Sequence, residues 1–101
     1  MRYVGFKEYV REILKAAEYK RDSELDCVVA IAPGLKGCMT QGNNFEEARD
    51  NLMDAIELWI TVTLKDGEDA PIINNTQLAT SVEQMEQIIP VENAVYAYHL
   101  C

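Results

Sequence analysis

The stretch that decides the fold runs from Pro33 to Gly67 and reads PGLKGCMTQGNNFEEARDNLMDAIELWITVTLKDG. It predicts a tight loop, a short strand and a long helix. Asn44 followed by Glu47 has the spacing of a capping box, in which the first side chain accepts a backbone N–H and the carboxylate reaches back. Lys65 offers a favourable charge in the last turn, and Gly67 can take the left-handed cap. We therefore expect a helix from Phe45 to Lys65, roughly 30 Å long.

This predicted helix has two different faces. Residues three and four apart form one wide, largely apolar stripe, which a sheet or a partner must cover: Phe45, Ala48, Leu52, Ala55, Ile56, Trp59 and Thr63. The opposite face carries Arg49 and five carboxylates, which are our candidate partner-binding residues: Glu46, Glu47, Asp50, Asp54 and Glu57. The alternative is a solvated helix face without a binding role.

The composition indicates a single small domain spanning residues 1–101. Apolar residues make up 49% of the chain and charged residues 26%, as in ordinary globular proteins. No apolar run approaches the roughly 18 residues that would span a membrane. The first residues contain no apolar segment of signal-peptide length. We therefore expect a soluble, cytoplasmic protein without a membrane partner.

The charge balance restricts the class of partner. Seventeen acidic and nine basic residues give a net charge of −8, which opposes approach to a polyanion. We expect no direct binding of nucleic acid. A basic partner suits the charge better, because complementary fields raise the rate of encounter. The alternative is that the acidity serves only solubility.

Three strands are expected ahead of the long helix. Leu25 to Ala32 is a short apolar run that ends at a proline and a glycine, which favours a buried strand. Lys15 to Asp22 can pair with it as a hairpin through Ser23 and Glu24, and Cys38 to Gln41 can run back as a third strand. The loop 33–37 requires at least one residue with positive φ. Before these strands, Phe6 to Leu14 reads as a short amphipathic helix.

The central strand is apolar on both faces. Val28, Ala30 and Ala32 share one face, and the two alanines there suit close packing against a helix. Cys27, Val29 and Ile31 share the other. That second face would need the amino-terminal helix or a second subunit to cover it.

The segment after Gly67 changes character. Glu68 to Thr80 has no period and reads as a connector. Thr80 or Ser81 can cap a short helix that Pro90 ends. Asn93 to Leu100 alternates in the manner of a fourth strand, which would close an open sheet edge in this chain or in another copy. We expect a dimer or tetramer. The candidate self-association residues lie in this segment: Val95, Tyr96, Tyr98 and Leu100.

The fold class that follows is α+β. We expect a three- to four-stranded, mostly antiparallel sheet with one long helix packed on one face. Short helices are expected at the amino terminus and before the last strand.

Catalytic chemistry finds little support in the sequence. Cys27, Cys38 and Cys101 match no zinc spacing, and the chain has one histidine, His99. We expect free thiols, no metal and no cofactor. A metal-dependent nuclease is the alternative, and its candidate carboxylates are Glu18, Asp22, Asp26, Asp50 and Asp54. Their positions beside a turn and on a polar helix face favour solvated surface, so we expect no catalysis.

One combination of residues resembles the HicB antitoxin family. It comprises Pro33-Gly34-Leu35-x-Gly37-Cys38-x-Thr40-x-Gly42, then Glu46-Glu47-Ala48, Glu57-x-Trp59 and Asp66-Gly67. The resemblance covers about half the chain, with a core at residues 15–68 and an extension at 69–101. It implies a trimmed ribonuclease H-like fold and an antitoxin that blocks HicA, a small basic toxin that cleaves messenger RNA.

Two departures from the HicB pattern refine this expectation. Lys36 stands where many members have proline, which affects only the turn. Members that repress their own operon carry a helix-turn-helix or ribbon-helix-helix module after the sheet. The segment from Ala70 to Cys101 is too short and too acidic to form such a DNA-binding module. A stand-alone relative of the antitoxin domain is therefore expected.

Overall fold

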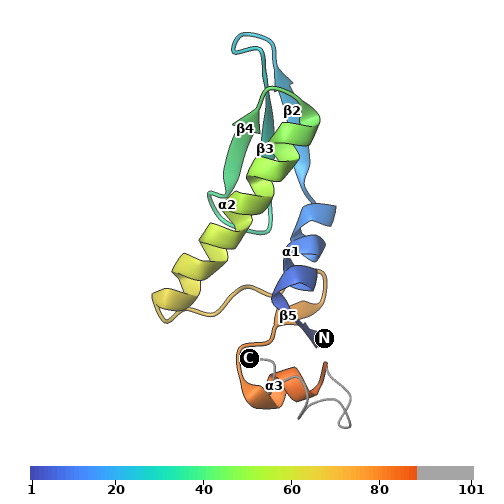
Figure 1. Cartoon of the computed structure of the whole chain (residues 1–101), viewed down its shortest axis with the longest axis vertical. Coiled ribbons are helices and arrows are strands. Elements are labelled where there is room, and N and C mark those ends of the chain that lie inside the picture. The colour runs from blue at the N-terminus through green and yellow to red at the C-terminus, as the bar shows by residue number, and fades with distance from the viewer. Residues whose placement is uncertain (89–101) are drawn as a thin grey trace.

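A computed structural model describes residues 1–88 of the chain (Figure 1). Its elements follow in the order β1 (Arg2–Val4), α1 (Phe6–Lys15), β2 (Glu18–Asp22), β3 (Cys27–Ile31), β4 (Met39–Gly42), α2 (Phe45–Lys65), β5 (Thr76–Leu78) and α3 (Val82–Glu86). The fold is α+β. None of the helices within residues 1–88 combines the length and apolarity needed to cross a membrane.

Both ends of α2 are fixed by the residues that predicted them. The Asn44 Oδ1 atom accepts from the Glu47 backbone N–H at 2.8 Å, and the Glu47 carboxylate accepts from the Asn43 N–H at 3.2 Å. At the other end Gly67 has φ +79°. The Gly67 N–H donates to the Leu64 carbonyl and the Glu68 N–H to the Thr63 carbonyl, which forms a Schellman motif. The predicted bounds of this helix are confirmed.

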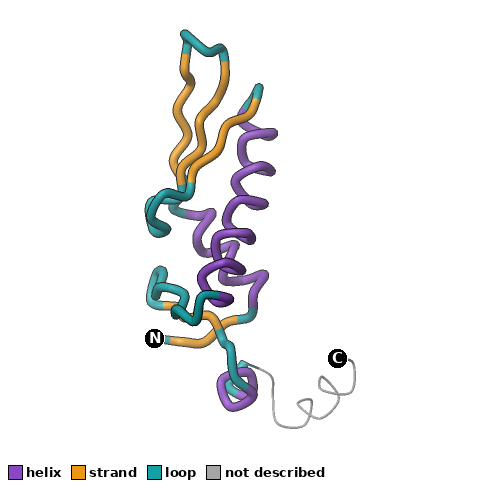
Figure 2. Tube along the Cα trace, turned by 90° about the vertical axis from the view of Figure 1, so that its left-hand side faces the viewer, coloured by secondary structure: helices purple, strands orange, loops and turns teal. Residues whose placement is uncertain are grey.

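A three-stranded antiparallel sheet, in the order β2-β3-β4, forms the upper half of the molecule. It is the predicted meander, with β2 beginning at Glu18 because Lys15 belongs to α1. Figure 2 shows α2 along one side of this sheet. Val28, Ala30 and Ala32 are fully buried on that side, and the small size of the two alanines had predicted close packing there.

Gly42 lets α2 approach β4 closely. A Cβ atom on Gly42 would lie 2.4 Å from the Ala48 backbone nitrogen, so no larger residue fits there without movement. The Ala48 side chain is itself fully buried. Strand and helix therefore touch through backbone atoms at this point.

A second, smaller sheet lies at the other end of the molecule and was not predicted. β1 pairs in parallel with β5, and Val4 lies opposite Leu78. Asn74 and Asn75 have φ values of +49° and +62°, and the Ile73 and Thr76 backbones exchange hydrogen bonds around them. Two successive residues with positive φ make a tight hairpin-type turn, which orients β5 toward β1.

The helix α1 joins the two halves. Its main contacts are with α2 and β5. Tyr9 is fully buried, and its hydroxyl donates to the Pro71 carbonyl. Leu52, Ile56 and Ile60 of α2 belong to the same continuous core as α1 and both sheets.

Two details of the predicted helix stripe are wrong. Ile60 is fully buried although the predicted stripe omitted it. Phe45 is 53% exposed, with its ring edge-on to Tyr19 at 6.1 Å and beneath the Arg21 guanidinium at 5.9 Å. The first helical turn extends past the core, so the stripe starts at Ala48.

Of the two elements predicted near the carboxy terminus, the short helix lies within residues 1–88 and the strand does not. The short helix is confirmed as α3, capped by the Ser81 hydroxyl on the Gln84 N–H, but it ends at Glu86, before Pro90. The expected strand Asn93 to Leu100 lies outside the described residues, with its candidate self-association residues Val95, Tyr96, Tyr98 and Leu100.

Candidate protein-binding surface

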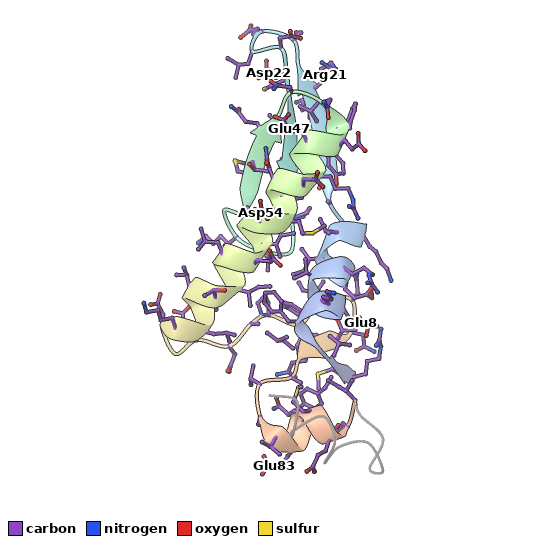
Figure 3. All side chains as sticks on the ribbon, viewed as in Figure 1. Glu8, Arg21, Asp22, Glu47, Asp54 and Glu83 are labelled. Atoms are coloured by element: carbon purple, nitrogen blue, oxygen red, sulfur yellow. The ribbon has the colours of Figure 1, made fainter. Side chains whose placement is uncertain are left out.

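Three of the five candidate carboxylates form a row along the solvent side of α2. Glu46, Asp50 and Asp54 are four residues apart, so they lie on one face of the helix. All three are exposed, and none has an ion pair with a side chain of residues 1–88. In Figure 3, Asp54 lies midway along α2. We call this row the acidic row.

The other two carboxylates have different surroundings. The Glu47 carboxylate is engaged at the start of the helix, where it accepts the Asn43 N–H. Glu57 lines a cleft between α1 and α2 together with Lys7, Arg11 and Arg49. Three cationic residues line the same cleft as this carboxylate, so Glu57 belongs to a surface of mixed charge.

An apolar groove runs beside the acidic row, between α2 and the start of β4. Its volume is about 490 Å³, and its walls include Lys36, Met39, Ala55, Leu58, Trp59 and Val62. Leu58 is 65% exposed and Met39 57%, which is high for large apolar side chains. The Trp59 indole N–H donates to the Lys36 carbonyl at 3.0 Å and fixes the loop against the helix. Sequence reasoning missed this groove because Leu58 and Val62 fall outside the predicted stripe.

The face of the upper sheet opposite α2 is partly open. Val29 and Ile31 are half-buried there, in a cleft lined also by Lys20 to Glu24. We expected the amino-terminal helix or a second subunit on this face. α1 packs instead mainly against α2 and β5, and Figure 2 shows no helix of residues 1–88 over this face.

The carboxylates of the nuclease alternative do not converge in the structure. Asp22 accepts the Glu24 and Leu25 backbone N–H groups at 3.0 and 3.2 Å and so shapes the hairpin turn. The Asp26 side chain is almost fully exposed, 3.9 Å from Arg21. Among residues 1–88, no three His, Cys, Asp or Glu side chains are placed to hold one metal ion. Glu18 lies at the start of β2, and Asp50 and Asp54 lie on α2.

The two described thiols are free and buried. Burial raises the pKa of the Cys38 thiol, so this residue is less able to form a thiolate at neutral pH. The Cys27 thiol contacts the Gln41 side-chain oxygen at 3.8 Å. Both environments are those of structural cysteines.

Comparison with known proteins gives a family and a shared fold. The UPF0150-like family matches residues 8–71. A UPF0150 protein of Synechocystis sp., ssr1765, is 45% identical over 42 residues, which are 42% of this chain and 53% of the relative. A UPF0150 protein of Helicobacter pylori is 52% identical over 31 residues, which are 31% of this chain and 43% of the relative. The chain thus spans about half the length of these relatives.

A solved structure extends the likeness in fold. The crystal structure of TTHA0281 from Thermus thermophilus superposes with a TM-score of 0.69 and 24% identity. The match covers 74% of this chain and 93% of that one. The arrangement of sheet and long helix is therefore shared with another protein.

Proposed function

The chain belongs to the UPF0150-like family, and we propose that it serves as a binding module of the antitoxin type. In this proposal it resembles HicB and sequesters a small basic protein that cleaves RNA. The chain itself performs no catalysis and contacts no nucleic acid.

The acidic row is the observation that carries the proposal. Glu46, Asp50 and Asp54 present three carboxylates on one rigid helix, without an ion pair among residues 1–88. Like charges four residues apart destabilise a helix by about 0.2–0.5 kcal/mol per pair. A cationic partner would remove that repulsion when it binds.

Charge alone would not give a tight complex. Exposed ion pairs contribute about 0–1 kcal/mol each, so the acidic row mainly raises the rate of encounter and rejects acidic partners. Affinity has to come from apolar contacts near the row, since binding energy concentrates in a few desolvated residues. Exposed apolar side chains of α2 lie beside the row.

The carboxylates proposed for a nuclease have other roles here. Asp22 holds a turn, and Asp26 is solvated beside Arg21. The net charge of −8 also opposes an RNA substrate. Both observations support a binding role over a nuclease.

Co-expression with the short basic protein encoded by the neighbouring open reading frame tests the proposal. We expect the complex to co-purify and the toxicity of the basic protein to be suppressed. Glu46→Lys combined with Asp50→Lys should weaken binding at least tenfold, or about 1.4 kcal/mol. Affinity is measured by titration calorimetry.

The matched control is Glu83→Lys combined with Glu86→Lys, which makes the same charge change on α3. Each pair includes one carboxylate in a first helical turn, so the cost to the helix is comparable. An equal loss of affinity in both double variants would show that the effect comes from net charge and not from the position of the acidic row. The absence of a short basic neighbour, or unchanged affinity in the α2 variant, would contradict the proposal.

A further inference from the structure

The cleft between α1 and α2 gathers positive charge on an acidic protein. Its volume is about 310 Å³, and two rows of side chains line it: Lys7, Val10, Arg11 and Leu14 from α1, and Arg49, Met53 and Glu57 from α2. Both rows have spacings of three and four residues, so each row is one face of its helix. Three cations and one carboxylate give this lining a net charge of +2, whereas the whole chain has a net charge of −8.

The three cations of the cleft form no ion pair with another side chain of residues 1–88. The two carboxylates of α1 are engaged elsewhere, Glu8 with Arg2 and Glu12 with Lys15. The residues that carry the three cations are exposed. Their charged groups can therefore turn toward a bound anion without breaking an ion pair in this part of the chain.

The positions of Lys7 and Arg11 are unfavourable for α1 itself. These residues are four apart, and like charges at that spacing destabilise a helix. Lys7 is also the second residue of α1, where the helix dipole favours an anion over a cation. Proteins break such local rules mainly at functional sites. An anion bound in the cleft would relieve both effects.

The directions of the two helices order the charges along the cleft. In Figure 1 the chain runs upward through α1 and downward through α2, so the two rows are antiparallel. Arg49 therefore lies toward the Leu14 end of the cleft and Lys7 toward the opposite end, with Arg11 between them. Glu57 is two turns along α2 from Arg49, away from the Leu14 end. The part of the lining without a carboxylate is thus between Arg11 and Arg49.

The floor of the cleft is aliphatic. Val10 is buried, and Leu14 and Met53 are half-buried. Within residues 1–88, the lining contains no aromatic ring on which a nucleobase could stack. Ligand sites in proteins have volumes from about 300 Å³ upward. The volume of this cleft is that of about ten water molecules, which suits a ligand of roughly ten to fifteen non-hydrogen atoms.

We propose that this cleft binds a small phosphate monoester that carries an aliphatic group. Such a phosphate is close to a dianion at pH 7, which matches the net charge of +2 on the lining. The planar guanidinium groups of Arg11 and Arg49 suit its oxygen atoms. The aliphatic group covers Val10, Leu14 and Met53. This site is separate from the acidic row and does not depend on the proposed function.

Titration of the isotope-labelled full chain with hexyl phosphate, followed by nuclear magnetic resonance at constant ionic strength, tests the proposal. We expect a dissociation constant of about 1 mM, as for other ligands of this size. The amide signals that move should belong to residues 7–14 and 49–57. Butyl phosphate is shorter by two CH₂ groups and should bind about tenfold more weakly, because burial of each CH₂ group favours binding by up to about fourfold.

Charge variants test the order of residues along the cleft. Arg11→Gln and Arg49→Gln should each weaken binding by about tenfold, through loss of a charged hydrogen bond. Lys7→Gln should weaken it only about twofold, because Lys7 lies toward the other end. Glu57→Gln should instead strengthen binding, since it removes a negative charge from the lining. The matched control is Arg21→Gln, which removes a guanidinium from β2 and should leave the affinity unchanged.

Several results would overturn the proposal. Inorganic phosphate that binds as tightly as hexyl phosphate would indicate an adventitious ion only. Hexanoate that binds as tightly would argue against a dianionic head. Equal losses in Arg21→Gln and Arg49→Gln would show that the effect comes from net charge. Amide spectra confirm that each variant is folded, and binding of a basic partner is measured separately through Glu46 and Asp50, so the two proposals can fail independently.

Discussion

At the scale of single residues, Gly42 has the strictest requirement for space. The Ala48 backbone lies so close that an added Cβ would overlap it. The obstacle is backbone and not a flexible side chain, so the helix itself would have to move. The sequence placed Gly42 at the end of a strand, but it gave no sign of this contact.

Gly42→Ala should therefore lower the free energy of unfolding by about 3 kcal/mol, at the upper end of the usual cost of overpacking. Urea denaturation followed by circular dichroism measures the change. Gly5→Ala is the matched control, because Gly5 has φ −76° and open space around its Cβ position. Gly5 is the N-cap of α1, where alanine is less favourable than glycine, so this control should still cost less than Gly42→Ala, about 1 kcal/mol. Equal effects in both variants would show that the close approach is unimportant.

Tyr9 combines complete burial with one hydrogen bond, from its hydroxyl to the Pro71 carbonyl. Burial raises the pKa of this phenol from 10.0 to about 12. As the pH rises, the Tyr9 hydroxyl therefore loses its proton at a lower pH in the unfolded chain than in the folded chain. Tyr9 therefore contributes stability that is fully present below pH 10 and is lost as the pH rises toward 12.

Tyr9→Phe keeps the ring and removes the hydroxyl, so at pH 7 it should cost about 1 kcal/mol. The difference between wild type and variant should shrink as the pH rises from 10 to 12, because the variant lacks the titrating group. Urea unfolding at several pH values measures both curves. A difference that stays constant across that range would refute the assignment.

At the scale of elements, α2 is the part that sequence reasoning described best. Its start and stop depend on local chemistry, at Asn44 and Gly67, which the chain order displays directly. β1 and β5 were missed for the opposite reason. Each has only three residues, and their pairing joins distant parts of the chain. The Asn74-Asn75 pair was the available signal, since adjacent asparagines tolerate the positive φ of a tight turn.

Asn44→Ala should lower the free energy of unfolding by about 1 kcal/mol through loss of the helix cap. Asn44→Ser should recover most of that loss, because serine also caps well. Asn43→Ala is the control next in sequence, since only its backbone N–H takes part in the cap. Thermal unfolding compares the three variants, and an equal loss in Asn43→Ala would argue against the cap as the cause.

At the scale of the whole molecule, the sequence predicted the upper sheet with its helix but not the position of α1. Periodicity identified α1 as an amphipathic helix, and its apolar face could have covered either side of the sheet. The structure places it against α2 and β5, where Tyr9, Val10 and Ile13 complete the core. That choice depends on the small second sheet, which the sequence did not reveal. The acidic row that we propose for partner binding is on α2, which lies over β4 and β3 of the upper sheet.

The parallel pairing of β1 with β5 has a consequence for the order of folding during synthesis. Residues 2–4 leave the ribosome more than seventy residues before their partners at 76–78. Residues 18–65 contain the complete meander and α2, with contacts that are closer in sequence and can form earlier. The upper sheet and α2 should therefore form while β1 is still unpaired. A chaperone that recognises short apolar segments would find Tyr3 and Val4 accessible until β5 has been synthesised.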